Sequence, residues 1–222
     1  MRGKIAIFID GNNLFHAARS VGVEIDYAKF LNFLRNDSPL LRAFFYTGVD
    51  EKAERQQGFL LWMRRNGYRV VEKELKTYAD GTKKANLDVE IAVDMLSLAD
   101  KYDTAVLVSG DEDFVYAVNA VAYKGCRVEI AGFRSNTAPK LIDVSDYFID
   151  LGEIADKVRK EVTHGARYEC ERDLHDTLPA PYMHDQQDSF QAAMRVVIES
   201  EIEEEAAEFE AATEFIRITD DH

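Results

Sequence analysis

The sequence predicts an α/β protein in which helices cover both faces of a parallel sheet. Five short apolar segments alternate with helical segments over the first 150 residues. The apolar segments are rich in valine, isoleucine and phenylalanine and show no polar alternation, which is typical of strands that are buried on both faces. Because strands and helices alternate, we expect right-handed βα units and a parallel sheet. A length of 222 residues is sufficient for one such domain with extensions.

The strands are expected at residues 3–9, 41–48, 68–75, 104–110 and 127–133. The helices are expected between them, at residues 26–36, 50–67, 87–101 and 113–125. Two of these helices end on a glycine, Gly67 and Gly125, as helices commonly do. The segment 73–86 contains Asp80-Gly81, a dipeptide that favours tight turns, and is predicted to form a hairpin.

The composition changes after the last predicted strand. We expect the first domain to occupy residues 1–163 and to end with a helix at 152–162. Residues 164–188 are polar, contain the sequence PAP and show no clear period, so they are predicted to be a linker. Residues 189–217 are predicted to form a long acidic helix, whose partial apolar stripe could pair two chains as a homodimer.

The acidic charge of the chain is concentrated in its last third. The whole chain has 27 basic and 41 acidic residues, for a net charge of −14. Of these, 7 basic and 19 acidic residues lie in 151–222, which leaves 20 and 22 in 1–150. The first part is therefore nearly neutral, and the overall charge does not exclude nucleic acid as a partner.

No apolar run approaches the roughly 20 residues that a membrane-spanning helix needs, so no membrane partner is expected. The N-terminal segment lacks the small-residue cleavage site of a signal peptide. Cys126 and Cys170 have neither metal-ligand spacing nor the pattern of a disulfide framework. We therefore expect a reduced, cytoplasmic compartment.

Carboxylates follow two of the predicted strands. Asp10 ends the strand at 3–9, and Asp111 and Asp113 follow the strand at 104–110. In a parallel sheet, ligands bind beyond the carboxyl ends of the strands, at the point where the strand order reverses. If these two strands flank that point, the three carboxylates converge, and Asp88 would join them from the start of a helix. Asp94 lies about 240° around that helix from Asp88 and is a weaker candidate.

Carboxylates held close together repel each other unless a cation compensates. A site with oxygen ligands alone selects hard ions such as Mg²⁺ or Mn²⁺, which can activate water toward a phosphodiester. Each residue also has a simpler interpretation. Asp10 could form a turn with Gly11, Asp88 could cap its helix, and the pair after 104–110 could complement a helix dipole. Ser109 and Glu112 have the spacing of a capping box.

Four segments resemble the NYN domain, and in particular its bacterial LabA-like (DUF88) branch: FIDGNNL, LDVEIAVDML, LVSGDEDF and LIDVSDYFIDL. The resemblance covers roughly residues 3–152. It implies a PIN-like three-layer α/β/α sandwich with strand order 3-2-1-4-5 and metal-dependent cleavage of RNA. The helix predicted at 189–217 would be a C-terminal helical extension beyond this domain. By motif position, the implied catalytic metal ligands are Asp10, Asp88, Asp111 and Asp113. The implied auxiliary residues are Asn13, Asp94 and Ser109.

Two positions depart from this family pattern. The family often has a lysine three residues before the acid matched by Asp88, where this chain has Ala85. Glu112 occupies a position that is often small, and it adds negative charge near the expected site. Neither departure removes an expected ligand.

Basic residues that could contact RNA phosphates lie in the predicted hairpin and after the fifth predicted strand. The expected contacts are Lys76, Lys83, Lys84 and Arg134. For any one of these lysines, a solvated surface position is the simpler interpretation.

The resulting hypothesis is a ribonuclease that depends on Mg²⁺ or Mn²⁺ and cleaves single-stranded or structured RNA. The alternative is a regulatory NYN protein without catalysis that binds RNA or a protein partner. A small-molecule hydrolase is not favoured, because the chain has no glycine-rich phosphate loop and no Gly-x-Ser-x-Gly motif.

Overall fold

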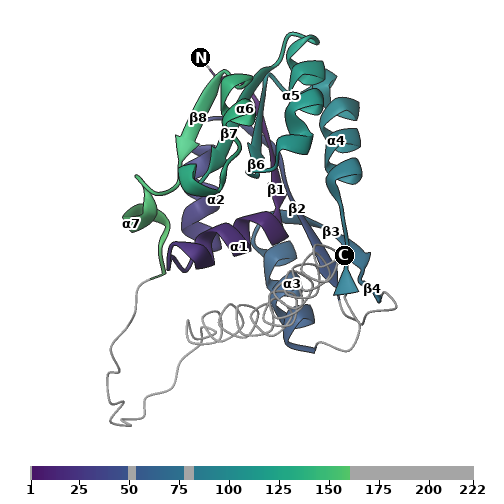
Figure 1. Cartoon of the computed structure of the whole chain (residues 1–222), viewed down its shortest axis with the longest axis vertical. Helices are drawn as coiled ribbons and strands as arrows, with labels where there is room; N and C mark the ends of the chain where they lie inside the picture. The colour runs from purple at the N-terminus through teal and green to yellow at the C-terminus, as the bar shows by residue number, and fades with distance from the viewer. Residues whose placement is uncertain (1, 50–53, 78–82, 161–222) are drawn as a thin grey trace, which may run out of the picture. The chain divides into compact units, whose positions relative to one another are not determined.

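The computed structural model describes residues 2–49, 54–77 and 83–160 (Figure 1). The chain divides into two compact units. Within the described residues, the first unit comprises 2–47, 63–72 and 86–160, and the second comprises 48–49, 54–62, 73–77 and 83–85. The predicted linker at 164–188 and the predicted acidic helix at 189–217 lie outside the described residues, as does the homodimer contact that this helix suggested.

A six-stranded sheet is the main feature of the fold. Its strands are β1 (Ile5–Asp10), β2 (Leu40–Val49), β3 (Tyr68–Glu74), β6 (Thr104–Val108), β7 (Arg127–Gly132) and β8 (Tyr147–Asp150). Their spatial order is β3-β2-β1-β6-β7-β8, and β1 pairs in parallel with both β2 and β6. The pairs β6–β7 and β7–β8 are also parallel. The predicted α/β class and the predicted order of the first five strands are therefore confirmed.

The sixth strand of the sheet, β8, was not predicted. It has only four residues, and they are exposed or half-buried because β8 is an edge strand. It therefore lacks the long apolar run that marks the central strands. In the second unit, β4 (Lys76–Thr77) and β5 (Lys83–Lys84) pair antiparallel, as the predicted hairpin requires.

Helices connect the strands in the order expected for βα units. The α-helices are α1 (Gly11–Ser20), α2 (Tyr27–Arg35), α3 (Glu54–Arg65), α4 (Asp88–Ser97), α5 (Val115–Ala122), α6 (Pro139–Asp143) and α7 (Ala155–Val158). Three short 3₁₀ turns are η1 (Ala99–Lys101), η2 (Glu112–Phe114) and η3 (Arg134–Asn136). The predicted helix at 87–101 thus divides into α4 and η1. Of the helix predicted at 152–162, the described residues 152–160 form the single turn α7.

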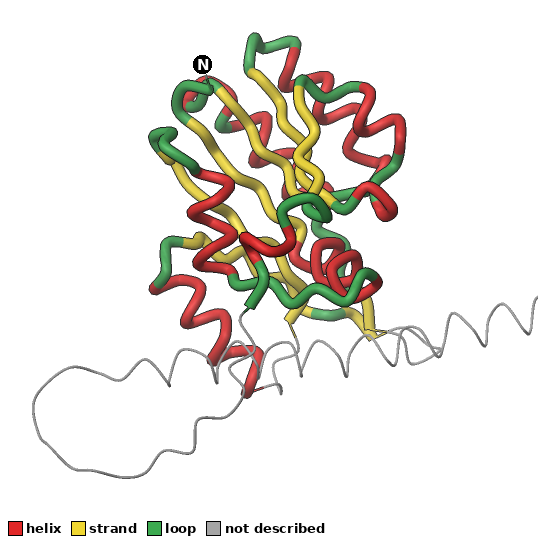
Figure 2. The backbone as a smooth tube through the Cα atoms, turned by 90° about the vertical axis from the view of Figure 1, so that its left-hand side faces the viewer, coloured by secondary structure: helices red, strands yellow, loops and turns green. Residues whose placement is uncertain are grey.

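Helices lie on both sides of the strands, which confirms the three-layer arrangement (Figure 2). Helix α4 contacts α5, and α2 contacts α7. Along the chain, the strands are added on one side of β1 as far as β3, and then on its other side from β6 onward. With right-handed crossovers, this reversal places α4 and α5 on one face of the sheet and α2 and α7 on the other. None of the helices in the described part of the chain combines the length and the apolar character that a membrane span requires.

The two central strands are buried along their length. Ile5, Ile7 and Ile9 of β1 are fully inaccessible to solvent, and all five residues of β6 are buried. Next to them, the rings of Tyr27, Phe45 and Tyr68 meet edge to face. The Tyr68 hydroxyl donates to the Tyr27 carbonyl at 2.7 Å, so its polar atom is satisfied inside the core. This packing gives the strand ends a rigid base.

A buried carboxylate on β7 ties the N-terminal segment to the sheet. The side chain of Glu129 is 3% exposed and accepts hydrogen bonds from the Nε atoms of Arg2, at 3.1 Å, and Arg127, at 2.8 Å. Arg2 also donates to the Leu34 carbonyl at the end of α2. Removing one partner of a buried ion pair is strongly destabilising because the other charge loses its compensation.

We expect Glu129→Ala to lower the free energy of unfolding by about 2–3 kcal/mol, measured by urea denaturation. The expected loss is smaller than for a fully buried pair, because Arg127 is 41% exposed and can be rehydrated. Glu153→Ala, at an exposed position, is the control and should have little effect. Equal stability of the two variants would contradict the assigned role of Glu129.

Candidate metal centre

The reversal of strand order brings the first two acidic segments together. Ile9 of β1 pairs with Val108 of β6, so Asp10 and Ser109 follow the same rung of the sheet. Asp111 and Asp113 come shortly afterwards, Asp111 as the N-cap of η2 and Asp113 within it. Asp10 and Asp111, which are far apart in the sequence, therefore leave the same end of two adjacent strands, as predicted.

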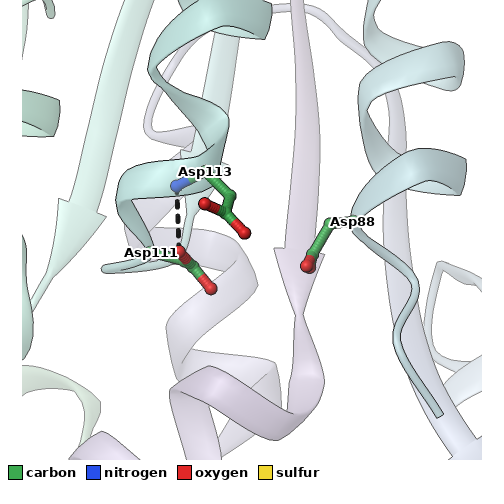
Figure 3. A group of neighbouring side chains, drawn as sticks. All are labelled: Asp88, Asp111 and Asp113. Atoms are coloured by element: carbon green, nitrogen blue, oxygen red, sulfur yellow. Dashed lines mark hydrogen bonds between the residues drawn. The ribbon is translucent and has the colours of Figure 1, made fainter.

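Three carboxylates form a cluster at this end of the sheet. Asp88, Asp111 and Asp113 each offer a carboxylate oxygen, and these oxygens lie within 4.8 Å of one another. Asp88 projects from the first turn of α4 toward the other two (Figure 3). The cluster is thus built from two elements that are separated in sequence. It could bind a metal ion.

Asp10 lies beside this cluster. The pKa of its carboxyl is raised from 3.8 to about 6, mainly by burial. The charges of Asp88 and Asp111 contribute to this increase, and the hydrogen bonds from Asn13 and Ser109 oppose it. Burial also raises the pKa of Asp88, again with contributions from Asp111 and Asp113. Without a cation, the site therefore holds more negative charge than its surroundings stabilise.

Asn13 and Ser109 connect the two strand ends. The backbone N–H of Asn13 donates to Asp10 Oδ1 at 3.1 Å, and its side-chain Oδ1 accepts from the Gly110 N–H at 2.9 Å. Ser109 Oγ donates to Asp10 Oδ2 at 3.3 Å and accepts from the Asp111 N–H at 3.3 Å. Both residues thus contact the site from the positions that the family resemblance implies, and they orient Asp10 relative to Asp111.

The simpler interpretations hold in part. Asp10 caps α1, and Asp111 caps η2 by accepting from the Asp113 N–H at 2.9 Å (Figure 3). Asp88 is the first residue of α4 and not its cap, which is Leu87. The predicted capping box is absent, because Glu112 pairs instead with Lys140 at 2.6 Å. A capping carboxylate uses one oxygen for the cap and is oriented by it, so capping and metal binding are compatible.

Asp94 lies apart from the three-carboxylate cluster and has a different partner. Its Oδ2 accepts from the hydroxyl of Tyr46 at 2.8 Å. Tyr46 is 1% exposed and pairs with Asp10 in the β1–β2 register. Burial, together with Asp94, raises the pKa of this tyrosine, so its hydroxyl remains a donor. Tyr46 was not predicted. In the sequence it is marked only as an aromatic residue near the end of a predicted strand.

The basic residues expected to contact RNA fall in different places. Lys76 is exposed on β4, and Lys83 and Lys84 form β5, all in the second unit. Arg134 belongs to the first unit and lies on η3, where it pairs with Asp150 at 3.2 Å and covers the Phe148 ring at 4.8 Å. Its side chain remains 63% exposed, so it can still contact a ligand.

The donor set fits a hard divalent cation. The clustered ligands are carboxylate oxygens, which suit Mg²⁺ and Mn²⁺ rather than softer metals. Burial is the main cause of the raised pKa values of Asp10 and Asp88, and a bound cation would favour their charged forms and offset the smaller contribution from mutual repulsion. The cluster therefore combines a suitable geometry with an electrostatic reason to bind an ion.

The raised pKa of Asp10 makes stability depend on pH. Between about pH 4 and 6 the folded protein keeps this proton and the unfolded chain has lost it, so the metal-free protein loses stability as pH rises through that window. Asp10→Asn should remove this loss and be more stable than the wild type at pH 8 by on the order of 1–2 kcal/mol.

The measurement is urea unfolding at pH 5 and pH 8 in EDTA, with Asp143→Asn, at an exposed position, as the control. Added Mn²⁺ should stabilise the wild type and not Asp10→Asn. If the wild type and Asp10→Asn had the same pH dependence of stability, the pKa of Asp10 would not be raised in the folded protein.

Gly110 permits the close approach of two loops at the site. A Cβ at this position would overlap the Asn136 carbonyl oxygen and lie 3.0 Å from Thr137 Cα. These are backbone atoms, so the loop that carries Asp111 would have to move. We expect Gly110→Ala to lower the free energy of unfolding by about 1–3 kcal/mol and to weaken Mn²⁺ binding, measured by calorimetry. Unchanged affinity would mean that the loop position does not control the cluster.

Two known proteins are similar to most of this chain. The LabA protein of Synechococcus elongatus, named "Low amplitude and bright protein", is 34% identical over 165 residues, which cover 71% of this chain and 88% of that protein. A crystal structure of the Vibrio parahaemolyticus protein VPA0982, described as of unknown function, matches with a TM-score of 0.64 and 28% identity. The match covers 72% of this chain and 97% of that one.

Residues 4–152 match the NYN domain. This range includes all four aspartates of the site, which are Asp10, Asp88, Asp111 and Asp113. The match spans well over half of the chain, and it agrees with the limits of the resemblance seen in the sequence motifs. The chain therefore belongs to the NYN domain family, a PIN-like family related to nucleases.

Proposed function

We propose that this protein is a ribonuclease that uses Mg²⁺ or Mn²⁺ to hydrolyse phosphodiester bonds in RNA. The observation that supports this most directly is the cluster of Asp88, Asp111 and Asp113, whose ligand oxygens lie within 4.8 Å of one another beside the buried carboxyl of Asp10. Membership of the NYN family favours RNA as the substrate and phosphodiester hydrolysis as the reaction.

In this proposal, Asp88, Asp111 and Asp113 hold the cation, and Asp10 completes the set of ligands from β1. When bound, the ion would polarise a phosphate oxygen and lower the pKa of a water nucleophile. Asn13 and Ser109 keep Asp10 and Asp111 in register through their hydrogen bonds. Asp94 acts indirectly, since its bond to Tyr46 anchors the helix that begins at Asp88.

Arg134 is the proposed phosphate contact of the first unit. It lies on the loop after β7, and the carboxyl ends of parallel strands share one edge of the sheet. Its pairing with Asp150 and its packing on Phe148 hold the guanidinium in place, while most of the side chain stays exposed. Lys76, Lys83 and Lys84 are proposed as further phosphate contacts from the hairpin of the second unit.

We expect Asp111→Asn to lower kcat/KM for RNA cleavage in Mn²⁺ by more than about 100-fold. Loss of a residue that only hydrogen-bonds to a metal ligand already lowers metal affinity or activity by about 10–100-fold. The measurement is cleavage of labelled RNA, with labelled DNA in parallel, in Mn²⁺ and in EDTA. Asp37→Asn is the control, since this exposed residue precedes β2, at the opposite end of the sheet from the site. Circular dichroism checks that both variants fold.

Cleavage that survives excess EDTA, or that Asp111→Asn leaves intact, would overturn the proposal. RNA binding without cleavage by the wild type in either metal would instead favour the alternative, a regulatory protein that keeps the fold and binds RNA.

A further inference from the structure

Exposed apolar side chains gather on two neighbouring helices of the first unit. Among the described residues, seven large apolar side chains are exposed, and four of them lie on α4, on α5 or directly after α5. These are Val89, Val93, Tyr116 and Tyr123, which are 70%, 53%, 84% and 88% exposed. Helices α4 and α5 contact each other, so these side chains belong to one side of the fold.

This side of the fold begins at the carboxylate cluster. Val89 directly follows Asp88 on α4, and Tyr116 is three residues after Asp113, in the first turn of α5. The two aspartates face each other between the starts of these helices (Figure 3). Tyr116 therefore lies about one helical turn beyond Asp113, on the helix that follows the cluster in the chain.

Helix α5 carries no charge of its own, since its sequence VYAVNAVA contains neither an acidic nor a basic residue. The charged residues that precede Tyr116 are Glu112 and Asp113 on η2, and Glu112 is already paired with Lys140. Helix α5 therefore offers no cation to a phosphate group. A flat aromatic face is suited to a different part of a nucleotide, the base, which can stack on it in any sequence.

We propose that Tyr116 is the stacking platform for a base next to the scissile bond, so that the substrate is single-stranded RNA. This inference rests on the proposed ribonuclease function and specifies its substrate class. In a duplex each base is already stacked between its neighbours, and only an unpaired nucleotide can place its base on a protein ring. Specificity for unpaired RNA then comes from Tyr116, and the carboxylates supply the chemistry.

The test is cleavage of an unstructured pentanucleotide RNA in Mn²⁺ by the full-length wild type, Tyr116→Ala and Tyr116→Phe. Loss of base stacking should raise KM about tenfold in Tyr116→Ala, with kcat nearly unchanged. Tyr116→Phe should retain the wild-type KM, because stacking needs the ring and not the hydroxyl. Tyr123→Ala is the matched control. It removes an equally exposed tyrosine about 10 Å further along the helix axis, and it should change KM less than twofold.

Abasic substrates make the test specific. An abasic nucleotide is placed at each position of the pentanucleotide in turn. At one position, the abasic nucleotide should raise the wild-type KM as much as Tyr116→Ala does. At that position, the abasic nucleotide and Tyr116→Ala together should raise KM no more than either change alone. Duplex RNA of the same sequence should be cleaved poorly by the wild type, and Tyr116→Ala should not alter that rate.

The outcomes separate the two proposals. If the wild type cleaves RNA but Tyr116→Ala has an unchanged KM, or Tyr123→Ala is equally impaired, the stacking role is overturned and the ribonuclease function stands. If the wild type cleaves no RNA in Mn²⁺, both proposals fall. If Tyr116→Ala instead changes the sedimentation coefficient of the protein and leaves KM unchanged, the surface binds a second copy of the chain and the stacking role is likewise overturned.

Discussion

The pairing of β1 with β6 is the constraint on which the site depends. In this register Ile9 lies beside Val108, so the residues that follow each strand emerge at the same point. Two side-chain links then close the gap, one from Ser109 to Asp10 and one from Asn13 to the Gly110 N–H. A shift of one residue would turn every side chain of β1 to the opposite face and remove Asp10 from the site.

The fold holds these carboxylates together against their electrostatic repulsion. The site has a raised pKa at Asp10 and at Asp88, which is an unfavourable arrangement for the protein without a cation. The strands beneath it are fully buried and tightly packed, so they supply the rigidity that the cluster itself lacks. Helix α4 is fixed separately, through the bond between Asp94 and Tyr46 on β2. A site that is strained when empty and relieved when loaded is suited to binding a metal ion.

The charges around the centre leave few cations for a polynucleotide. In the first unit, Lys140 is paired with Glu112 and Arg134 with Asp150. Glu112 occupies the position where the family often has a small residue, so this chain adds an acid there and compensates it locally. Both of these cations therefore already have an acidic partner. Contacts made by the metal ion and by an exposed aromatic ring gain importance where basic residues are scarce.

The α/β class could be read from the local pattern of apolar runs and helices, and a parallel sheet brings the carboxyl ends of its strands to one edge. The order of the five strands came from the resemblance of four motifs to the NYN domain. The convergence of Asp10 with Asp111 was expected only if their two strands flank the reversal of strand order. The sequence could not reveal β8, because a short edge strand has no distinctive pattern. It also left open what Asp94 and Glu112 contact, since their partners Tyr46 and Lys140 come from elements far away in the chain. Local periodicity thus determines which elements form and what chemistry they carry. Only tertiary packing decides which polar side chains meet, because those distances depend on the register and rotation of elements that no local pattern specifies.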